Sequence, residues 1–472
     1  MSTPIELTLA SHTNVGKTTL LRTLLRRDVG EVADRAHVTS MAEGHVLLEA
    51  GGETLRLWDT PGFGDSARLL KRLEKSGNPI GWFLTQVWDR FTDRAFHGAQ
   101  EAVRNVRERS DVVLYLANAA EPPASAGYVA AEMRILAWIG KPVVVLLNQT
   151  GAARGAEADA ADEDAWARAL AAHVPAHRVM VLDAFARCWV QEDRLLAAVA
   201  DLLPPERAAA FATLRAAWRE RNLEVFEASM AALARQMADA AVDREPLEAP
   251  GAKPDRAMGA LARRLELGVR ENMDALLALH GLPGRAAQPI LERLESEFAV
   301  TRPADVKKTG IIGGMVSGAI GGLAADAAAA GMTFGAGALI GGILGALGAG
   351  GAAQAYNVLR GAEQGRVRWA PEVRARWPAA ALLRYLAVAH YGRGRGEWSE
   401  DPAPARWHAL AEEMAVLHRD ALDDAFSWAD GDADPVELAA RLQPAIDAMA
   451  RAALLRLYPT AGWLDREATT VR

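Results

Sequence analysis

One short motif constrains the fold of this chain more than any other feature. Residues 11–18 read Ser-His-Thr-Asn-Val-Gly-Lys-Thr, directly after an apolar run at Ile5–Ala10 and directly before a helical pattern. This matches the phosphate-binding loop GxxxxGK[ST], except that Ser11 replaces the first glycine. Such a loop needs a strand before it and a helix after it, because its backbone N–H groups and the helix N-terminus together surround phosphate oxygens. The motif therefore predicts a nucleotide-binding α/β domain.

Composition restricts the cellular compartment and the partners of that domain. The 472 residues carry 53 Lys and Arg against 60 Asp and Glu, a net charge of −7, so the whole chain has no positive field that attracts nucleic acid. Cys188 is the single cysteine, which excludes an intramolecular disulfide and fits a reducing compartment. Met1–Ala10 lacks the pattern of a secretory signal peptide. We expect a cytoplasmic setting and no nucleic-acid partner.

Six short apolar runs alternate with helical patterns over residues 1–203. This rhythm predicts a mainly parallel sheet covered by helices. The second and third runs are joined by Gly51-Gly52, which predicts a tight hairpin and hence one antiparallel strand. The six runs are Ile5–Ala10, Val46–Ala50, Thr54–Asp59, Val112–Ala117, Val143–Asn148 and Val179–Asp183.

The pair Pro204-Pro205 marks a change of character, because helical patterns replace strand patterns after it. Apolar stripes at helical spacing predict two long helices, and Glu245–Pro254 reads as a loop. The tail from Tyr356 also reads as helical. We predict an all-α region divided into residues 204–308, 309–355 and 356–472. The stripes are Phe226, Met230, Leu233 and Met237, then Leu261, Leu265, Val269, Met273 and Leu276.

The chemistry of a phosphate-binding loop assigns roles to individual side chains. Lys17 neutralises the outer phosphates, and the Thr18 hydroxyl binds Mg²⁺. Asp59-Thr-Pro-Gly62 ends the third strand, where P-loop proteins place an acidic residue for magnesium and a glycine that senses the terminal phosphate. Thr39 fits a switch threonine that also binds magnesium, or else is a plain loop residue.

The phosphate-binding loop, the candidate switch threonine Thr39 and the Asp59-Thr-Pro-Gly62 motif resemble those of the Era/TrmE/EngA-type bacterial GTPases. So does the β-hairpin between Thr39 and Asp59. The resemblance covers about the first 200 residues. It implies GTP or GDP as ligand, with Mg²⁺. The catalytic residues implied are Lys17, Asn14, Thr39 and Gly62, and the magnesium ligands are Thr18, Thr39 and Asp59. The implied nucleotide contacts are Ser11, Asn14, Val15, Gly16, Lys17, Thr18, Thr19, Asn148, Gln149, Asp183 and Ala184.

The base-reading motif departs from the family. Relatives have Asn-Lys-x-Asp after the fifth strand, whereas this chain has Asn148-Gln149-Thr150-Gly151 and lacks the aspartate. That carboxylate discriminates guanine from adenine, so base specificity stays open. Asp183 is either a substitute acceptor or a cap of the next helix.

A second departure concerns hydrolysis. Phe63 follows Gly62 where a water-positioning glutamine sits in Ras-like proteins. Relatives with a hydrophobic residue there bind potassium through an asparagine that Asn14 matches; alternatively, Asn14 only hydrogen-bonds the loop backbone. We predict slow GTP hydrolysis, accelerated by K⁺ and by a homodimer through the GTPase domain or by another partner.

Aromatic residues form a third departure. The segment between Asp59 and Asp111 is long and contains Trp82, Phe83, Trp88, Phe91 and Phe96. These residues either pack on the domain or form a partner-binding element beside the switch. His12, in the loop itself, is expected to be solvated.

A glycine-rich stretch inside residues 309–355 carries the other informative pattern. Glycines recur every fourth residue, which gives a helix a smooth face for close packing. Basic residues flank the stretch on both sides, which places both of its ends on the cytoplasmic side of the inner membrane. A hairpin that dips into the membrane or crosses it twice satisfies this orientation rule. A buried hairpin in a cytoplasmic protein is the alternative. The glycines are Gly310, Gly314, Gly318, Gly322, Gly337, Gly341 and Gly345; the basic residues are Arg302, Lys307, Lys308, Arg360, Arg366, Arg368, Arg374 and Arg376.

Three functions are consistent with these patterns. The first is a membrane-associated GTPase switch. The second is a catalytically poor nucleotide-binding membrane scaffold or an NTPase of relaxed specificity. The third, an RNA or ribosome assembly factor, is disfavoured by the acidic net charge.

Overall fold

The structure is a computed structural model that describes residues 3–27, 29, 42–75, 77–85, 94–150, 155–171, 178–247, 255–282, 356–359, 365–391, 403–431 and 433–465. The chain forms two compact units. The first, which we call the sheet unit, comprises Met1–Leu223, His390–Ala403 and Leu457–Ala461. The second, the helical unit, comprises Glu224–Ala389, Pro404–Arg456 and Gly462–Arg472.

The sheet unit contains a six-stranded sheet of order β2-β3-β1-β4-β5-β6. Its strands are β1 (Ile5–Ser11), β2 (Glu43–Ala50), β3 (Glu53–Asp59), β4 (Val112–Asn118), β5 (Val143–Asn148) and β6 (Arg178–Val181). Only the pairing of β2 with β3 is antiparallel, as the Gly51-Gly52 hairpin predicted. Both glycines have positive φ, 58° and 81°, which the tight turn requires. The predicted α/β domain is confirmed.

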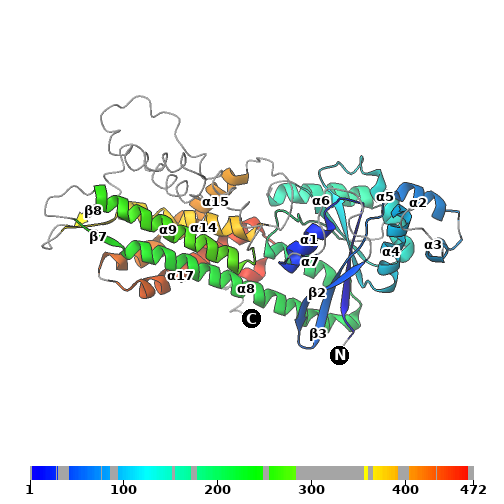
Figure 1. Cartoon of the computed structure of the whole chain (residues 1–472), viewed down its shortest axis with the longest axis horizontal. Coiled ribbons are helices and arrows are strands. Elements are labelled where there is room, and N and C mark those ends of the chain that lie inside the picture. The colour runs from blue at the N-terminus through cyan, green and yellow to red at the C-terminus, as the bar shows by residue number, and fades with distance from the viewer. Residues whose placement is uncertain are drawn as a thin grey trace, which may run out of the picture. The chain divides into compact units, whose positions relative to one another are not determined.

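Helices cover both faces of this sheet (Figure 1). One face carries α1 (Lys17–Leu25), α7 (Trp189–Ala200) and the first half of α8 (Pro205–Val242). The other face carries α2 (Ser66–Leu73), α3 (Pro79–Thr85), α4 (Arg94–Glu108), α5 (Gly127–Ile139) and α6 (Ala156–Leu170). Because β1, β3, β4, β5 and β6 run parallel, the loops after them meet at one edge of the sheet, where ligands bind in folds of this type.

Two of the aromatic residues between β3 and β4 belong to the core of the second face. Phe83 and Phe96 are 0% and 2% exposed, and Trp82 packs against the same cluster. This favours the packing interpretation for these three side chains. Trp88 and Phe91 lie outside the described residues.

The helical unit contains the second half of α8 and α9 (Asp255–Leu279), α14 (Trp377–Ala389), α15 (Ala403–Leu417), α16 (Arg419–Ser427) and α17 (Pro435–Leu457). Its described residues also include the one-turn elements α13 (Pro371–Arg374), η2 (Trp428–Asp430) and η3 (Gly462–Leu464). Both predicted apolar stripes lie in its core, on α8 and α9. Among the helices that the structure describes, none combines the length and apolarity needed to cross a membrane.

A small sheet in the helical unit corrects the prediction of an all-α region and a helical tail from Tyr356. Strands β7 (Arg244–Pro246), β8 (Tyr356–Leu359) and β9 (Arg366–Trp369) pair antiparallel in the order β7-β9-β8. In β9, Val367 and Trp369 are buried and alternate with two arginines. Strands of three or four residues are too short to give a recognisable alternating pattern, so the sequence did not reveal them.

Residues after the glycine-rich stretch also belong to the folded core. Trp369 and Trp377 are 1% and 3% exposed, and their ring centroids lie 6.0 Å apart. Two of the flanking arginines, Arg368 and Arg374, bind the Asp430 carboxylate at 2.9 and 2.7 Å. These side chains therefore serve packing and ion pairing within the helical unit.

The glycine-rich segment of residues 309–355 lies outside the described residues. The predicted domain boundaries at residues 203, 308 and 355 stay predictions. The sheet unit itself continues past residue 203 to Leu223, within α8.

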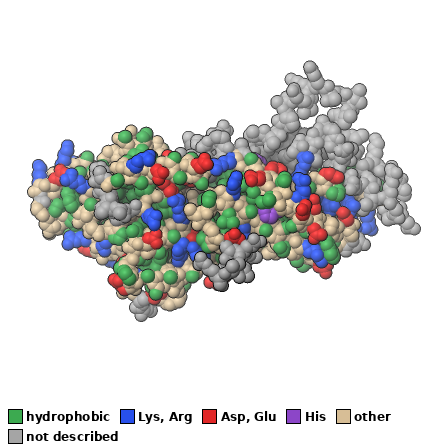
Figure 2. Space-filling view, turned by 180° about the vertical axis from the view of Figure 1, so that it is seen from behind, with side chains coloured by type: hydrophobic (Ala, Val, Ile, Leu, Met, Phe, Trp, Pro, Cys, Tyr) green, Lys and Arg blue, Asp and Glu red, His purple; other side chains and the backbone are tan. Residues whose placement is uncertain are grey.

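Charged side chains of both signs are distributed over the surface. On the face shown in Figure 2, Lys and Arg side chains are interspersed with Asp and Glu side chains. This mixture agrees with the modest net charge of −7.

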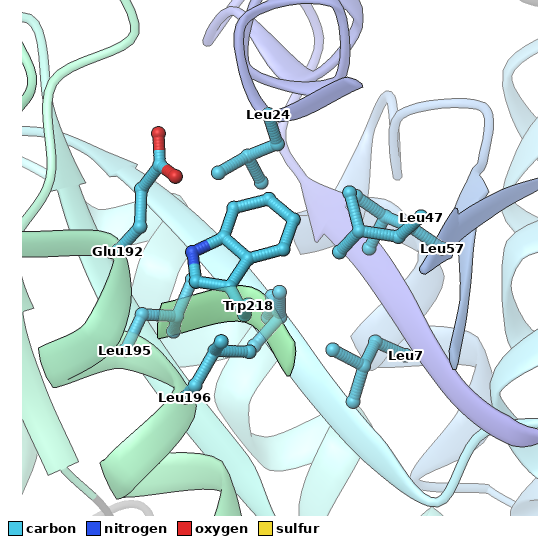
Figure 3. Close-up of a pocket in the computed structure, with 9 residues that line it drawn as sticks. Leu7, Leu24, Leu47, Leu57, Glu192, Leu195, Leu196 and Trp218 are labelled. Atoms are coloured by element: carbon cyan, nitrogen blue, oxygen red, sulfur yellow. The ribbon is translucent and has the colours of Figure 1, made fainter. Parts of the chain in front are cut away.

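Trp218 fixes the first half of α8 to the sheet unit. Its indole is 3% exposed and lies between Leu24 of α1 and two leucines of α7, at a small cavity lined mainly by leucine (Figure 3). The two leucines are Leu195 and Leu196. Shape complementarity of this kind makes the site sensitive to loss of volume.

We predict that Trp218→Ala lowers the free energy of unfolding by about 3 to 5 kcal/mol, because it removes a buried ring and enlarges a cavity. Chemical denaturation followed by far-UV circular dichroism measures the change. Trp428→Ala is the matched control, since Trp428 is 47% exposed, and it should cost no more than about 1 kcal/mol. Equal effects of the two substitutions would contradict this account of α8.

Candidate nucleotide site

The loop between β1 and α1 has the backbone of a phosphate-binding loop. Gly16, just before α1, adopts the left-handed conformation with φ 97°, and Asn14 does so with φ 62°. A Cβ atom on Gly16 would lie 2.6 Å from Nδ2 of Asn148. Glycine is therefore required at position 16 by both conformation and space.

Lys17 lies inside this loop and is 8% exposed. Its ammonium donates hydrogen bonds to Oγ of Ser11 at 2.9 Å and to the carbonyl oxygen of His12 at 3.4 Å. Burial lowers the pKa of Lys17, while the carboxylates of Asp59 and Glu132 act in the opposite direction. The ammonium thus has neutral hydrogen-bond partners, which phosphate oxygens are able to replace as stronger acceptors.

Thr18 and Asp59 form the second part of the site. The Thr18 hydroxyl donates to Oδ2 of Asp59 at 2.6 Å. Asp59 is 3% exposed, and its Oδ1 is buried without a hydrogen-bond partner among the described residues. Burial raises the pKa of Asp59, against the opposing effects of the Lys17 charge and the Thr18 hydrogen bond.

These two oxygen-bearing side chains fit Mg²⁺, which takes a few hard oxygen ligands from protein and completes its shell with water and phosphate. The buried, unpartnered Oδ1 of Asp59 is the atom that a cation would satisfy. No group of three or more His, Cys, Asp or Glu side chains suited to a metal occurs within the described ranges.

Gly62 lies against the phosphate-binding loop, as its predicted role requires. A Cβ atom on Gly62 would lie 2.9 Å from the backbone nitrogen and Cα of Thr13, so only glycine fits. The next residue, Phe63, donates its N–H to the Ser11 carbonyl at 3.1 Å and buries its ring in the core, 1% exposed. Its side chain has no group that orients water.

Asn148 joins the phosphate-binding loop to the loop after β6. It is fully buried. Its Nδ2 donates to the Val15 carbonyl at 2.6 Å, and its Oδ1 accepts from the Ala184 N–H at 2.7 Å. The Ala184 carbonyl in turn accepts from the Thr23 hydroxyl of α1 at 3.0 Å. Asn148, itself a predicted nucleotide contact, thus positions two others, Val15 and Ala184.

Asp183 organises the loop after β6. Its Oδ2 accepts from the N–H and hydroxyl of Thr150, at 2.7 and 3.1 Å, and its Oδ1 accepts from the Phe185 N–H at 2.8 Å. Burial raises the pKa of Asp183, while these hydrogen bonds lower it. The next helix, α7, begins at Trp189 with Cys188 as its N-cap, so the interpretation of Asp183 as a helix cap is wrong.

The remaining predicted residues differ in what surrounds them. Gln149, with φ 59°, places its Nε2 3.5 Å from the Asn14 carbonyl. The Asn14 side chain is exposed and makes no hydrogen bond to the described part of the chain, so the interpretation in which it binds the loop backbone is not observed. Thr19 is buried in α1 at 5% exposure, and Thr39 lies outside the described residues.

The sequence interpretation missed a buried cluster beside the loop. His12 Nδ1 lies 2.8 Å from Oε1 of Glu132 on α5, and the Tyr115 hydroxyl of β4 donates to Oε2 of Glu132 at 2.6 Å. His12 therefore binds Glu132 instead of being fully solvated as expected. The available signal was the placement of Glu132 on the apolar stripe of α5, beside Met133 and one turn from Leu136.

Fold and site together define a P-loop GTPase domain, and comparison with family models agrees. Residues 7–149 match the model described as 50S ribosome-binding GTPase. Residues 168–449, more than half of the chain, match the model described as domain of unknown function DUF3482. The chain belongs to this second family, and its N-terminal domain is a GTP-binding GTPase domain.

Several solved structures resemble the chain. A single-residue variant of Aquifex aeolicus Era bound to GDP·AlF4⁻ is 16% identical with a TM-score of 0.30, covering 58% of this chain and 89% of Era. The mGMPPNP-bound NFeoB of S. thermophilus is 14% identical with a TM-score of 0.24, covering 47% of this chain and 76% of NFeoB. No curated protein matches the chain.

We predict that Asn148→Asp weakens GDP binding at least about tenfold, because a carboxylate oxygen replaces the Nδ2 donor and faces the Val15 carbonyl. Titration of a fluorescent GDP analogue measures the affinity. Asn78→Asp is the matched control: the Asn78 side chain accepts from the Gly81 N–H, which aspartate does equally well. Unchanged affinity in Asn148→Asp would contradict the positioning role of Asn148.

Proposed function

We propose that this protein is a molecular switch that binds GTP and GDP with Mg²⁺ and hydrolyses GTP slowly. The observation that carries the proposal is the pair Thr18–Asp59, with a buried unpartnered carboxylate oxygen, beside Lys17 in a phosphate-binding loop. These residues supply one cationic and two oxygen-bearing side chains for a magnesium-bound phosphate chain.

Within this proposal each side chain has a distinct task. Lys17 exchanges its contacts with Ser11 and His12 for the outer phosphate oxygens. Thr18 and Asp59 hold Mg²⁺, which neutralises phosphate charge when bound. Gly62, pressed against Thr13, keeps the chain after β3 beside the phosphates, so that it responds to the terminal one.

Slow hydrolysis follows from the surroundings of Phe63. Because this side chain is buried and apolar, position 63 does not orient an attacking water. We propose that K⁺ bound at the exposed Asn14 side chain, and a second copy of the GTPase domain, supply the missing stabilisation of transition-state charge.

Few side-chain atoms at this end of the site are left to recognise guanine. The amide of Asn148 is occupied by Val15 and Ala184, and both carboxylate oxygens of Asp183 already accept hydrogen bonds from the loop backbone. We propose that the base contacts Gln149 and the Asp183–Ala184 loop, and that the preference for guanine over adenine is modest.

We expect Lys17→Ala to abolish binding of a fluorescent guanine nucleotide, because it removes the buried ammonium of the phosphate-binding loop. In the wild-type chain, unlabelled GTP and GDP should compete better than ATP, and hydrolysis should be faster in potassium than in sodium buffer. Equal competition by ATP would favour a relaxed NTPase. Binding without turnover in potassium would favour a nucleotide-binding scaffold, and unchanged affinity in Lys17→Ala would contradict the site itself.

We further propose that the glycine-rich segment of residues 309–355 associates with the cytoplasmic face of the inner membrane. Support for this comes from the sequence alone: the glycines that recur every fourth residue and the basic residues before them at Arg302, Lys307 and Lys308.

Replacing Gly314 and Gly318 together by leucine should disrupt close helix packing in this segment. Fractionation of cell extracts measures membrane association, and thermal unfolding of the purified chain measures stability. We expect at least one of the two to change. Leucine at Gly77 and Gly127, which have no atom within 4 Å of an added Cβ and lie in the sheet unit, controls for added apolar surface. If fractionation and stability both stay as in the wild type, the proposal is wrong.

A further inference from the structure

A buried carboxylate lies next to the phosphate-binding loop without a role in the function proposed above. Glu132 is fully buried on α5, between Tyr115 and His12. Because a carboxylate only accepts hydrogen bonds, both neighbours donate to it, and His12 carries a proton on Nδ1. The His12 ring also contacts the ring of Tyr128, with centroids 4.5 Å apart and the planes inclined at 34°.

The same carboxylate lies near the lysine of the site. His12 binds Glu132 with its side chain, and its backbone carbonyl accepts from the Lys17 ammonium. A second buried carboxylate, Asp59, binds Thr18, the residue next to Lys17. Asp59 has a function in this arrangement, since it is suited to Mg²⁺, whereas a Glu132 carboxylate without partners would attract the Lys17 ammonium away from phosphate.

His12 links these two features. Its side chain binds Glu132, while its backbone carbonyl accepts a hydrogen bond from Lys17 at 3.4 Å. One residue thus holds the carboxylate by its side chain and meets the ammonium by its backbone.

We propose that His12 is a positioning residue for nucleotide binding: with Tyr115, it occupies the Glu132 carboxylate and so leaves Lys17 available to phosphate. This inference rests on the proposed function, because it concerns the same phosphate site. A loop that only needed an anchor to α5 would use any hydrogen bond there. A loop in which His12 must occupy Glu132 loses affinity when His12 is removed and regains it when the Glu132 charge is removed as well.

The experiment is a double-mutant cycle on the full chain, read by the Kd of a fluorescent GDP analogue with Mg²⁺. We expect His12→Ala to weaken binding about tenfold, a coupling typical of residues in one hydrogen-bond network. Glu132→Gln should leave affinity within about threefold, because glutamine still accepts from His12 through its carbonyl oxygen. The double variant should recover to within about threefold of the wild type.

Tyr115→Phe provides a second route that leaves the loop sequence intact. It removes one donor to Glu132 and keeps the shape of the ring, so we expect weaker GDP binding that Glu132→Gln again restores. Arg134→Ala is the matched control, since Arg134 lies on the same helix, is 55% exposed and pairs with Glu74 instead. Circular dichroism verifies that each variant is folded.

Three outcomes decide the matter. If the double variant binds as weakly as His12→Ala or more weakly, His12 is only an anchor and the inference is overturned. If neither His12→Ala nor Tyr115→Phe alters affinity, the cluster has no part in binding. In both cases the wild type still binds GDP and the proposed function stands, whereas a wild-type chain that binds no nucleotide overturns the proposed function and this inference together.

Discussion

The buried ammonium of Lys17 is the group on which the nucleotide site depends. A buried charge is costly unless hydrogen bonds and opposite charges compensate for it. Here the compensation comes from two neutral oxygens of the loop, on Ser11 and His12, and from the more distant carboxylates of Asp59 and Glu132. The left-handed conformation of Gly16 before α1 and the close approach of Gly62 to the loop bring these groups around one point.

That arrangement in turn depends on the parallel sheet. Asp59, Asn148 and Asp183 come from the ends of β3, β5 and from just after β6, and parallel pairing places these ends along one edge. Two apolar clusters, one on each face of the sheet, hold the strands and therefore the loops in register. Because the sheet already holds these loops in place, the hydrogen bonds between them form without a further loss of loop entropy. Asn148 accordingly uses its Nδ2 and its Oδ1 to bind backbone groups of two different loops.

The helical unit is built on different principles. Its core includes the apolar stripes on α8 and α9, together with Trp369 and Trp377, which meet edge to face. Arg368 and Arg374 converge on Asp430, so charged residues that follow the glycine-rich segment in sequence are partly used for internal ion pairs. One buried cation, Arg384, has the amide oxygen of Gln236 as its acceptor, and burial lowers its pKa to about 10.

The sequence by itself determined the phosphate-binding loop, the six strands with their one antiparallel member, and the two long apolar stripes. These features are local, because each depends on residues that are neighbours along the chain or on apolar residues that recur at strand or helix spacing. Only the tertiary structure decided the rest. Strand β7 pairs with β9 across more than a hundred residues, and Glu132 meets His12 across a similar separation. Asp183 binds Thr150 instead of capping α7 because the loops after β5 and β6 are brought together by the sheet. Such contacts join distant segments, so the period and composition of either segment alone do not specify them.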